Sequence, residues 1–155
     1  MPRRLEILLA DVPLLQGLDD DRLALLAGCA GNVRFLPGEV LFRQGDPASS
    51  FYVLRQGSVA IETFAPPRGS VLIETLEAGE VLGWSWLFAP YRWHFDARAL
   101  TTVRATGFDG VCLREKCDAD PALGYDLMTR FAQVLIERLQ WTRLRLLDVY
   151  GDGNG

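Results

Sequence analysis

The sequence predicts a mainly β fold in which helices flank a small antiparallel barrel or jelly roll. Short apolar runs, such as 40–42 and 51–54, are separated by Pro-Gly, Gln-Gly-Asp and Gln-Gly turns. Glycine supplies the positive φ that such turns require, and proline sets the turn entry. A long apolar helical pattern then follows the last strand. Strands at this regular spacing are typical of a closed antiparallel barrel or jelly roll.

The chain begins with helical segments. Residues 5–10 predict a helical turn that ends before Pro13, because the residue preceding a proline avoids helical backbone angles. Residues 19–29 predict a helix in which Asp19 is the N-cap. The two aspartates that follow lie in the first turn, where the helix dipole favours negative charge.

Strand signals occupy the middle of the chain, from residue 33 to about 109. Val59 and Ile61 alternate with their neighbours as in a half-buried strand, and 65–69 predicts a hairpin loop. Residues 84–88 predict one helical turn before a proline. Further strands are expected at 71–76, 94–100 and 102–108.

A long helix is predicted from Pro121 to about Tyr150, because proline suits the first helical position and Gly151 suits the end. Apolar residues recur along it at alternating spacings of four and three, as in helices that pair with a partner helix. Packing on the barrel of the same chain is the alternative interpretation. The seam consists of Met128, Ala132, Leu135, Leu139, Thr142, Leu146 and Val149.

The composition fits one globular domain. The chain has 155 residues, 49% of them hydrophobic, which is enough for a sizeable core. Its net charge of −4 argues against a nucleic-acid surface, which needs a basic patch. No apolar run approaches the ~20 residues of a membrane span, and no secretory signal is visible. The three cysteines, an odd number, suit a reducing cytoplasm better than a disulfide scaffold.

Residues 35–46 and 51–59 resemble the cyclic-nucleotide-binding domain of the Crp/Fnr regulators, and the resemblance extends from about Leu14 to Tyr150. It implies a double-stranded β-helix, or jelly roll, with a long C-terminal helix that pairs across a two-fold axis. We therefore expect a homodimer. One domain, 1–155, is expected, with an N-terminal helical segment at 1–32, a barrel at 33–110 and C-terminal helices at 111–150.

The family holds its ligand in a stretch that corresponds to residues 79–100. A Gly-Glu pair opens a short helix, and about ten residues later an Arg-Ser/Thr-Ala triplet follows; the arginine and backbone N–H groups hold the cyclic phosphate, and the glutamate holds the ribose. Here Gly83 matches the glycine, but Trp84 stands in place of the glutamate. Because 97–100 resembles the sequence after the triplet, the triplet positions fall on Trp93, His94 and Phe95.

The ribose acceptor and the phosphate arginine are therefore absent in this register. Arg92 lies one residue early, and a one-residue shift turns a strand side chain to the other face, so solvent exposure is preferred over anion binding. Ser85 is either a cap residue or a ligand of a weakly held anion.

Large aromatic residues crowd the same segment, with three of the four tryptophans at 84, 86 and 93. Three interpretations stay open: a self-plugged pocket, an apolar pocket for another flat ligand, and an exposed patch for a protein partner. The candidate pocket residues are Gly83, Trp84, Ser85, Trp86, Arg92, Trp93 and His94.

Other chemistry is sparse. His94, the only histidine, is interpreted as structural, with haem ligation as the alternative because one sensor in the wider family holds haem. Cys112 and Cys117 have no further cysteine or histidine nearby to complete a metal site, and all three cysteines are interpreted as packing residues. No nucleophile–base pair or phosphate-binding loop is present, so we expect no catalysis, no metal and no cofactor.

The leading functional hypothesis is a non-catalytic sensory or regulatory domain, dimeric and cytoplasmic, which acts through protein contacts and has a degenerate phosphate cassette. One alternative is a genuine binder of cyclic AMP, cyclic GMP or another small ligand with an altered pocket. A second alternative is an accessory docking subunit of a redox enzyme. The regulators of this family continue into a helix-turn-helix domain, whereas this chain ends at Gly155, so a stand-alone form without direct DNA binding is expected.

Overall fold

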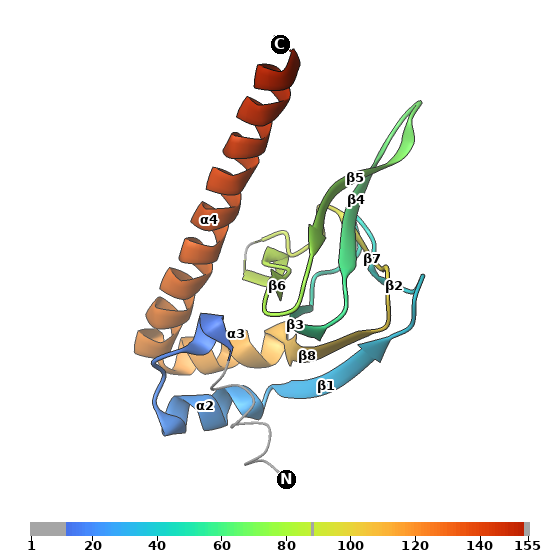
Figure 1. The fold of residues 1–155 in the computed structure, drawn as a ribbon. Coiled ribbons are helices and arrows are strands. Elements are labelled where there is room, and N and C mark those ends of the chain that lie inside the picture. Colours follow the sequence, from blue (N-terminus) through green and yellow to red (C-terminus); the bar gives the residue numbers. More distant parts are fainter. Residues whose placement is uncertain (1–11, 88, 154–155) are drawn as a thin grey trace.

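In the described part of the chain, eight strands form two four-stranded antiparallel sheets, as the predicted jelly roll requires (Figure 1). The computed structural model describes residues 12–87 and 89–153. One sheet has the strand order β1-β8-β3-β6 and the other β2-β7-β4-β5. The strands are β1 (Ala30–Phe35), β2 (Val40–Phe42), β3 (Ser50–Gln56), β4 (Val59–Ala65), β5 (Gly69–Leu76), β6 (Val81–Leu82), β7 (Asp96–Ala99) and β8 (Val103–Asp109).

The turns that predicted the barrel have the expected backbone. Gly57, between β3 and β4, has a φ of 94°, and a Cβ atom there would collide with the carbonyl oxygen of Thr102. The strand expected from residue 94 begins later, at Asp96, and the residues just before it, Trp93 and Phe95, line a cavity.

Helices cover one end of the barrel. They are η1 (Pro13–Leu15), α2 (Asp20–Ala27), η2 (Ser85–Leu87), α3 (Gly110–Ala119) and α4 (Pro121–Gly153). The predicted N-cap of α2 is confirmed, since the Asp19 carboxylate accepts the backbone N–H of Arg22 at 2.8 Å. The helical turn expected at 5–10 lies outside the described residues. The long helix continues past Gly151, where the sequence predicted its end.

The N-terminal half of α4 is anchored to the rest of the domain. Leu123, Leu127 and Phe131 are buried in a core cluster that also contains η1 and α2 residues. Arg130 donates hydrogen bonds to the carbonyl oxygens of Leu14 and Gln16. The C-terminal half of α4 extends beyond the barrel on the same side as the β4–β5 hairpin (Figure 1).

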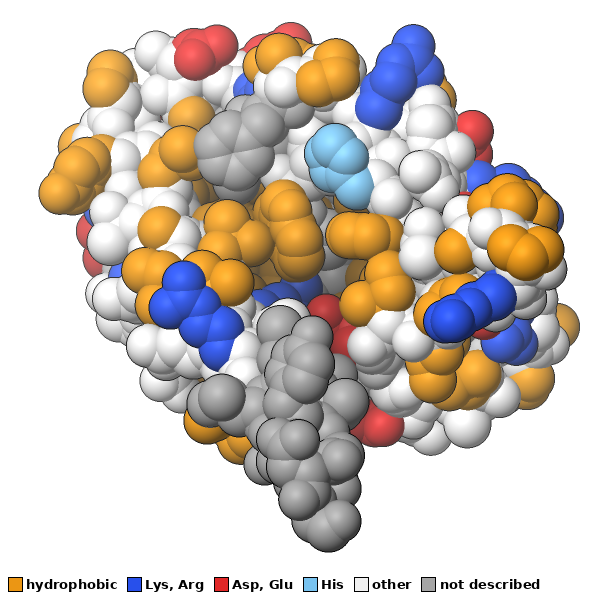
Figure 2. Space-filling model, turned by 90° about the horizontal axis from the view of Figure 1, so that it is seen from above, with side chains coloured by type: hydrophobic (Ala, Val, Ile, Leu, Met, Phe, Trp, Pro, Cys, Tyr) orange, Lys and Arg blue, Asp and Glu red, His pale blue; other side chains and the backbone are white. Residues whose placement is uncertain are grey.

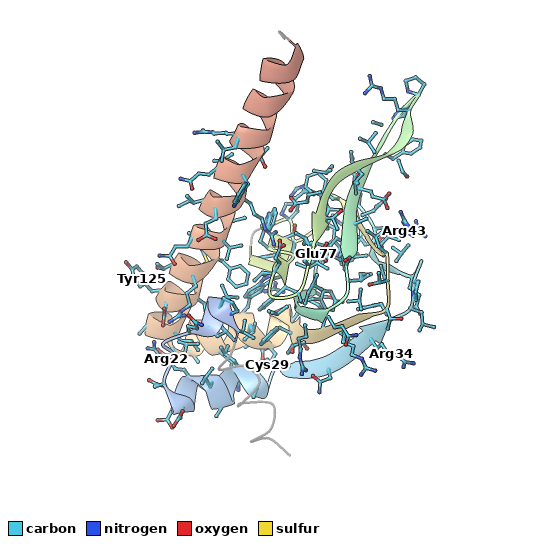
Figure 3. All side chains as sticks on the ribbon, viewed as in Figure 1. Arg22, Cys29, Arg34, Arg43, Glu77 and Tyr125 are labelled. Atoms are coloured by element: carbon cyan, nitrogen blue, oxygen red, sulfur yellow. A yellow bond between two sulfur atoms is a disulfide. The ribbon has the colours of Figure 1, made fainter. Side chains whose placement is uncertain are left out.

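The interpretation of all three cysteines as packing residues is wrong. Cys29, at the junction of α2 and β1 (Figure 3), forms a disulfide with Cys112 in the first turn of α3, with Cα atoms 5.7 Å apart. The count of three misled because the pair is separated by 83 residues in sequence, and only the fold brings it together. Cys117 is the remaining free thiol. No helix among the described residues is both long and apolar enough to cross a bilayer.

Candidate functional site

A cavity of about 320 Å³ lies between the barrel and α4. Figure 2 shows it as a hollow walled mainly by hydrophobic side chains, with a basic and an acidic side chain at its floor and the histidine at its rim. Strands β2, β4 and β5, the segment after β6 and one face of α4 contribute its walls. The lining residues are Phe42, Ile61, Ile73, Glu74, Leu76, Leu82, Gly83, Trp84, Ser85, Trp93, His94, Phe95, Leu135, Arg138, Leu139 and Thr142.

Trp93 occupies the space next to Gly83. Its indole stacks on the Phe42 ring with centroids 3.7 Å apart and planes 9° apart, and only 6% of the residue is exposed. Gly83 has a φ of 100°, and a Cβ atom there would lie 2.6 Å from the Trp93 indole. The glycine therefore serves two purposes, because it permits the left-handed backbone and leaves room for the ring.

Trp84 directly follows Gly83 in sequence and contacts α4. The guanidinium of Arg138, a residue of α4, lies 5.1 Å from the centroid of the Trp84 ring, which is a cation–π distance. Arg138 also donates a hydrogen bond to the Val81 carbonyl oxygen. Burial lowers the pKa of Arg138, and the nearby Glu74 and Glu80 carboxylates partly oppose that shift.

Ser85 and His94 complete the polar part of the lining. Ser85 is buried and begins η2, a single turn of three residues. His94 is exposed at the rim, so it is not a satisfied core histidine. No group of three potential metal ligands occurs within residues 12–87 and 89–153.

Two residues that the sequence placed in the pocket lie elsewhere. Trp86 is 0% exposed and packs between Phe51 and Phe131 in the core beneath α4, because η2 turns it away from its neighbour Trp84. Arg92 is exposed and donates to the carbonyl oxygen of Gly45 at 2.8 Å, so its guanidinium is directed away from the cavity. The cavity thus brings together Gly83, Trp84, Ser85, Trp93 and His94.

A family model described as the cyclic nucleotide-binding domain matches residues 32–120, which is more than half of the chain. This chain belongs to the cyclic nucleotide-binding domain family. The matched region holds most of β1, strands β2 to β8 and α3, including the segment from Gly83 to His94. A search of curated proteins finds no match.

Solved structures agree with the family assignment. A putative cyclic nucleotide-binding protein from Geobacter metallireducens is 28% identical, with a TM-score of 0.77 and coverage of 89% of this chain and 97% of that chain. The N-terminal domain of a Streptomyces coelicolor transcriptional regulator is 26% identical, with a TM-score of 0.66 and coverage of 90% and 94%. The sensor domain of the regulator DNR from Pseudomonas aeruginosa shares the fold at 22% identity, with a TM-score of 0.71 and coverage of 90% and 93%. The predicted resemblance to Crp/Fnr regulators is confirmed.

In this cyclic nucleotide-binding domain, some residues of the predicted seam of α4 line the cavity and others are exposed to solvent. Leu135, Leu139 and Thr142 line the cavity of their own chain, whereas Met128 and Ala132 are exposed. The side chains of Leu146 and Val149 lie outside the described part of the structure. Part of the heptad pattern therefore reflects the cavity wall, which the sequence alone could not separate from a helix-pairing face.

Sequence reasoning missed Arg138. The available signal is its position four residues after Val134 and seven after Phe131, which places it on the barrel-facing side of α4. A charged residue on the buried side of an amphipathic helix is unusual and marks a special environment. That this environment is a cavity depends on how α4 crosses the barrel, and the local sequence pattern does not predict the crossing.

Proposed function

We propose that this cyclic nucleotide-binding domain is a non-catalytic sensory or regulatory domain whose phosphate cassette is degenerate. The observation that carries the proposal is the Trp93 indole lying against Gly83, at the glycine that matches the family's phosphate-binding motif. A second aromatic residue, Trp84, takes the place of the ribose-binding glutamate. Residues 1–155 act as one domain in this proposal.

The charge pattern of the barrel side of the cavity supports this view. A buried phosphate needs a charged partner, because desolvating an unpaired ion is very costly. Arg92, the arginine nearest the expected position in sequence, is engaged outside the cavity with Gly45. Arg98 is engaged on the sheet surface, where its Nε donates to the Glu62 carboxylate at 2.9 Å.

We expect wild-type protein to bind cyclic AMP and cyclic GMP weakly or not at all. The missing arginine and glutamate remove charge-assisted contacts worth ~1.5–3 kcal/mol each, so together they weaken binding about a hundredfold or more. Titration calorimetry measures this directly. A dissociation constant in the micromolar range or tighter for either nucleotide contradicts the proposal.

A matched pair of variants sharpens this test. Trp84→Glu with Trp93→Arg reintroduces both charged groups, and Trp84→Gln with Trp93→Met opens the same space without charge. If only the Trp84→Glu, Trp93→Arg variant gains nucleotide affinity, the missing charged groups explain the weak binding of the wild type. The space filled by the two tryptophans would then not be a sufficient explanation.

Dimerisation through α4 is part of the proposal. Tyr125, Met128 and Ile136 are 78%, 43% and 54% exposed, and at 100° per residue they lie within about a quarter-turn of the helix. Figure 3 shows Tyr125 on the side of α4 that faces away from the barrel. An exposed apolar stripe of this kind marks an interaction surface, and an identical helix from a second copy matches it. Met128 belongs both to this stripe and to the predicted seam, and the exposed seam residue Ala132 lies in the same quarter-turn, whereas Leu139 lines the cavity.

Met128→Glu with Ile136→Glu is therefore expected to convert a dimer into a monomer, as measured by light scattering. Charges in a paired apolar seam lose their hydration without gaining a partner. Gln133→Glu with Gln140→Glu adds the same charge at exposed positions off the stripe and should leave the dimer intact. Leu135 is left unchanged because it lines the cavity. A wild type that is monomeric at high concentration rules out this interface.

We further propose a cytoplasmic location and signalling through a protein partner, without direct contact to nucleic acid or membrane. The acidic net charge of −4 supports the absence of nucleic-acid contact. The Cys29–Cys112 disulfide is unusual for that location, because the cytoplasm keeps most protein thiols reduced.

A further inference from the structure

We propose that the cavity binds a planar aromatic carboxylate whose anionic group pairs with Arg138 of α4. The inference rests on the proposed function, because it assigns a ligand class to the cavity in which the phosphate cassette is degenerate. In this proposal the residue that pairs with the ligand's negative charge lies on the long helix α4, whereas the family's phosphate-binding arginine lies on the barrel. Three observations carry it: the state of Arg138, the chemistry of the walls and the position of Glu74.

Arg138 is a partly buried cation with no carboxylate within 4.0 Å among the described residues, and Glu74 and Glu80 act on it electrostatically from farther away. The ion pairs found there within 4.0 Å involve Arg22, Arg98 and Arg130. Arg138 makes one hydrogen bond, to the Val81 carbonyl oxygen, and stacks over Trp84. A guanidinium has five N–H donors in a planar fork, a geometry that matches both oxygens of a carboxylate. A carboxylate entering the cavity would therefore satisfy donors that the protein leaves unused.

The cavity walls favour a flat apolar body attached to that carboxylate. Phe42, Trp84, Trp93 and Phe95 line it together with leucine and isoleucine side chains. Aromatic walls contact planar rings well through stacked and edge-to-face arrangements. The volume of about 320 Å³ lies at the small end of ligand pockets and leaves room for a bicyclic ring system.

Glu74 restricts the charge of the ligand. It lies in β5, lines the same cavity and acts electrostatically on Arg138 from beyond ion-pair distance. A singly charged carboxylate can pair with Arg138 at modest repulsion from Glu74. A dianionic phosphate would place a second negative charge near Glu74, which a single arginine does not compensate.

The arrangement also connects the ligand to the dimer. Arg138 belongs to the same helix as the exposed stripe, whereas Trp93 and Phe42 belong to the barrel. A ligand held between them fixes α4 relative to the barrel. Binding at this site therefore has a direct path to the helix that we propose to pair.

The test compares 2-naphthoate with its neutral counterpart 2-naphthamide by titration calorimetry on the full chain. We expect the wild type to prefer the carboxylate by about tenfold or more, the size of a charge-assisted contact. R138M keeps the length of the side chain and removes the charge, so it should bind both compounds equally. R143M, which removes an exposed arginine of the same helix, should behave as the wild type.

Absence of binding by 2-naphthoate, equal affinity for acid and amide, or a preference that survives in R138M overturns the inference. If the aliphatic acid decanoate binds as tightly as 2-naphthoate or more tightly, the inference that the ligand is aromatic is overturned. The wild-type comparison of acid with amide decides even if R138M fails to fold, which a thermal melt reveals. Cyclic AMP is titrated in parallel: tight cyclic AMP binding contradicts the proposed function, whereas failure of 2-naphthoate alone contradicts only this inference.

Discussion

Trp86→Ala is expected to lower the free energy of unfolding by ~3–5 kcal/mol, the range for removing a large buried aromatic side chain. Trp86 is 0% exposed, and its ring centroid lies 5.0 Å from that of Phe51 and 5.5 Å from that of Phe131. These contacts join η2, β3 and α4. The cavity left by alanine would loosen the contact that holds α4 on the barrel. Denaturant unfolding followed by circular dichroism measures the change.

Two controls separate packing from other causes. Trp86→Phe keeps an aromatic ring and removes an indole N–H that is buried without a partner among the described residues, so a loss below ~1.5 kcal/mol is expected. Trp141→Ala alters a side chain that is 66% exposed, and a change within ~0.5 kcal/mol is expected. A loss for Trp86→Ala no larger than that for Trp141→Ala would show that Trp86 is not a core residue.

Gly83→Ala is the second change with a large expected effect. The left-handed backbone at φ 100° costs an alanine ~1–2 kcal/mol. Displacing the Trp93 indole, which lies 2.6 Å from the added Cβ, costs a further ~1–3 kcal/mol as overpacking. Gly79→Ala isolates the backbone part, because Gly79 has a similar φ of 92° and no atom within 4 Å of its Cβ position. We expect the loss in unfolding free energy to be greater for Gly83→Ala than for Gly79→Ala.

The extra loss should depend on Trp93. In a double-mutant cycle, Gly83→Ala in a Trp93→Leu background should cost about as much as Gly79→Ala, since the clash has been removed. An undiminished loss in that background would mean that the indole does not occupy the space beside Gly83. The cycle thus tests the plugged cassette through stability alone, without any ligand.

The sequence predicted the barrel because its turns are encoded locally. The turn at Gly57 and the helix cap at Asp19 each involve residues close in sequence. Both could therefore be inferred from the residues around them. The expectation that the cassette lacks its arginine and glutamate could also be formed from the sequence, because the cassette is one continuous segment. Family resemblance and local chemistry therefore led to the same fold.

What the sequence could not show depends on contacts between distant segments. Trp86 and Trp93 looked equivalent, yet one packs in the core under α4 and the other lies against Gly83. Cys29 and Cys112 meet only because α3 returns to the end of α2. Arg138 lines the cavity because α4 crosses the barrel there. The residues next to Arg138 in sequence do not indicate where α4 crosses.

The central claim is that the site beside Gly83 does not hold a cyclic nucleotide. The most direct measurement is a crystal structure of the wild-type protein grown with excess cyclic AMP. We predict that the Trp93 indole remains stacked on Phe42 and fills the space beside Gly83, with no nucleotide in the cavity. Electron density for a cyclic phosphate next to Gly83 and Ser85, with Trp93 displaced, would contradict the account.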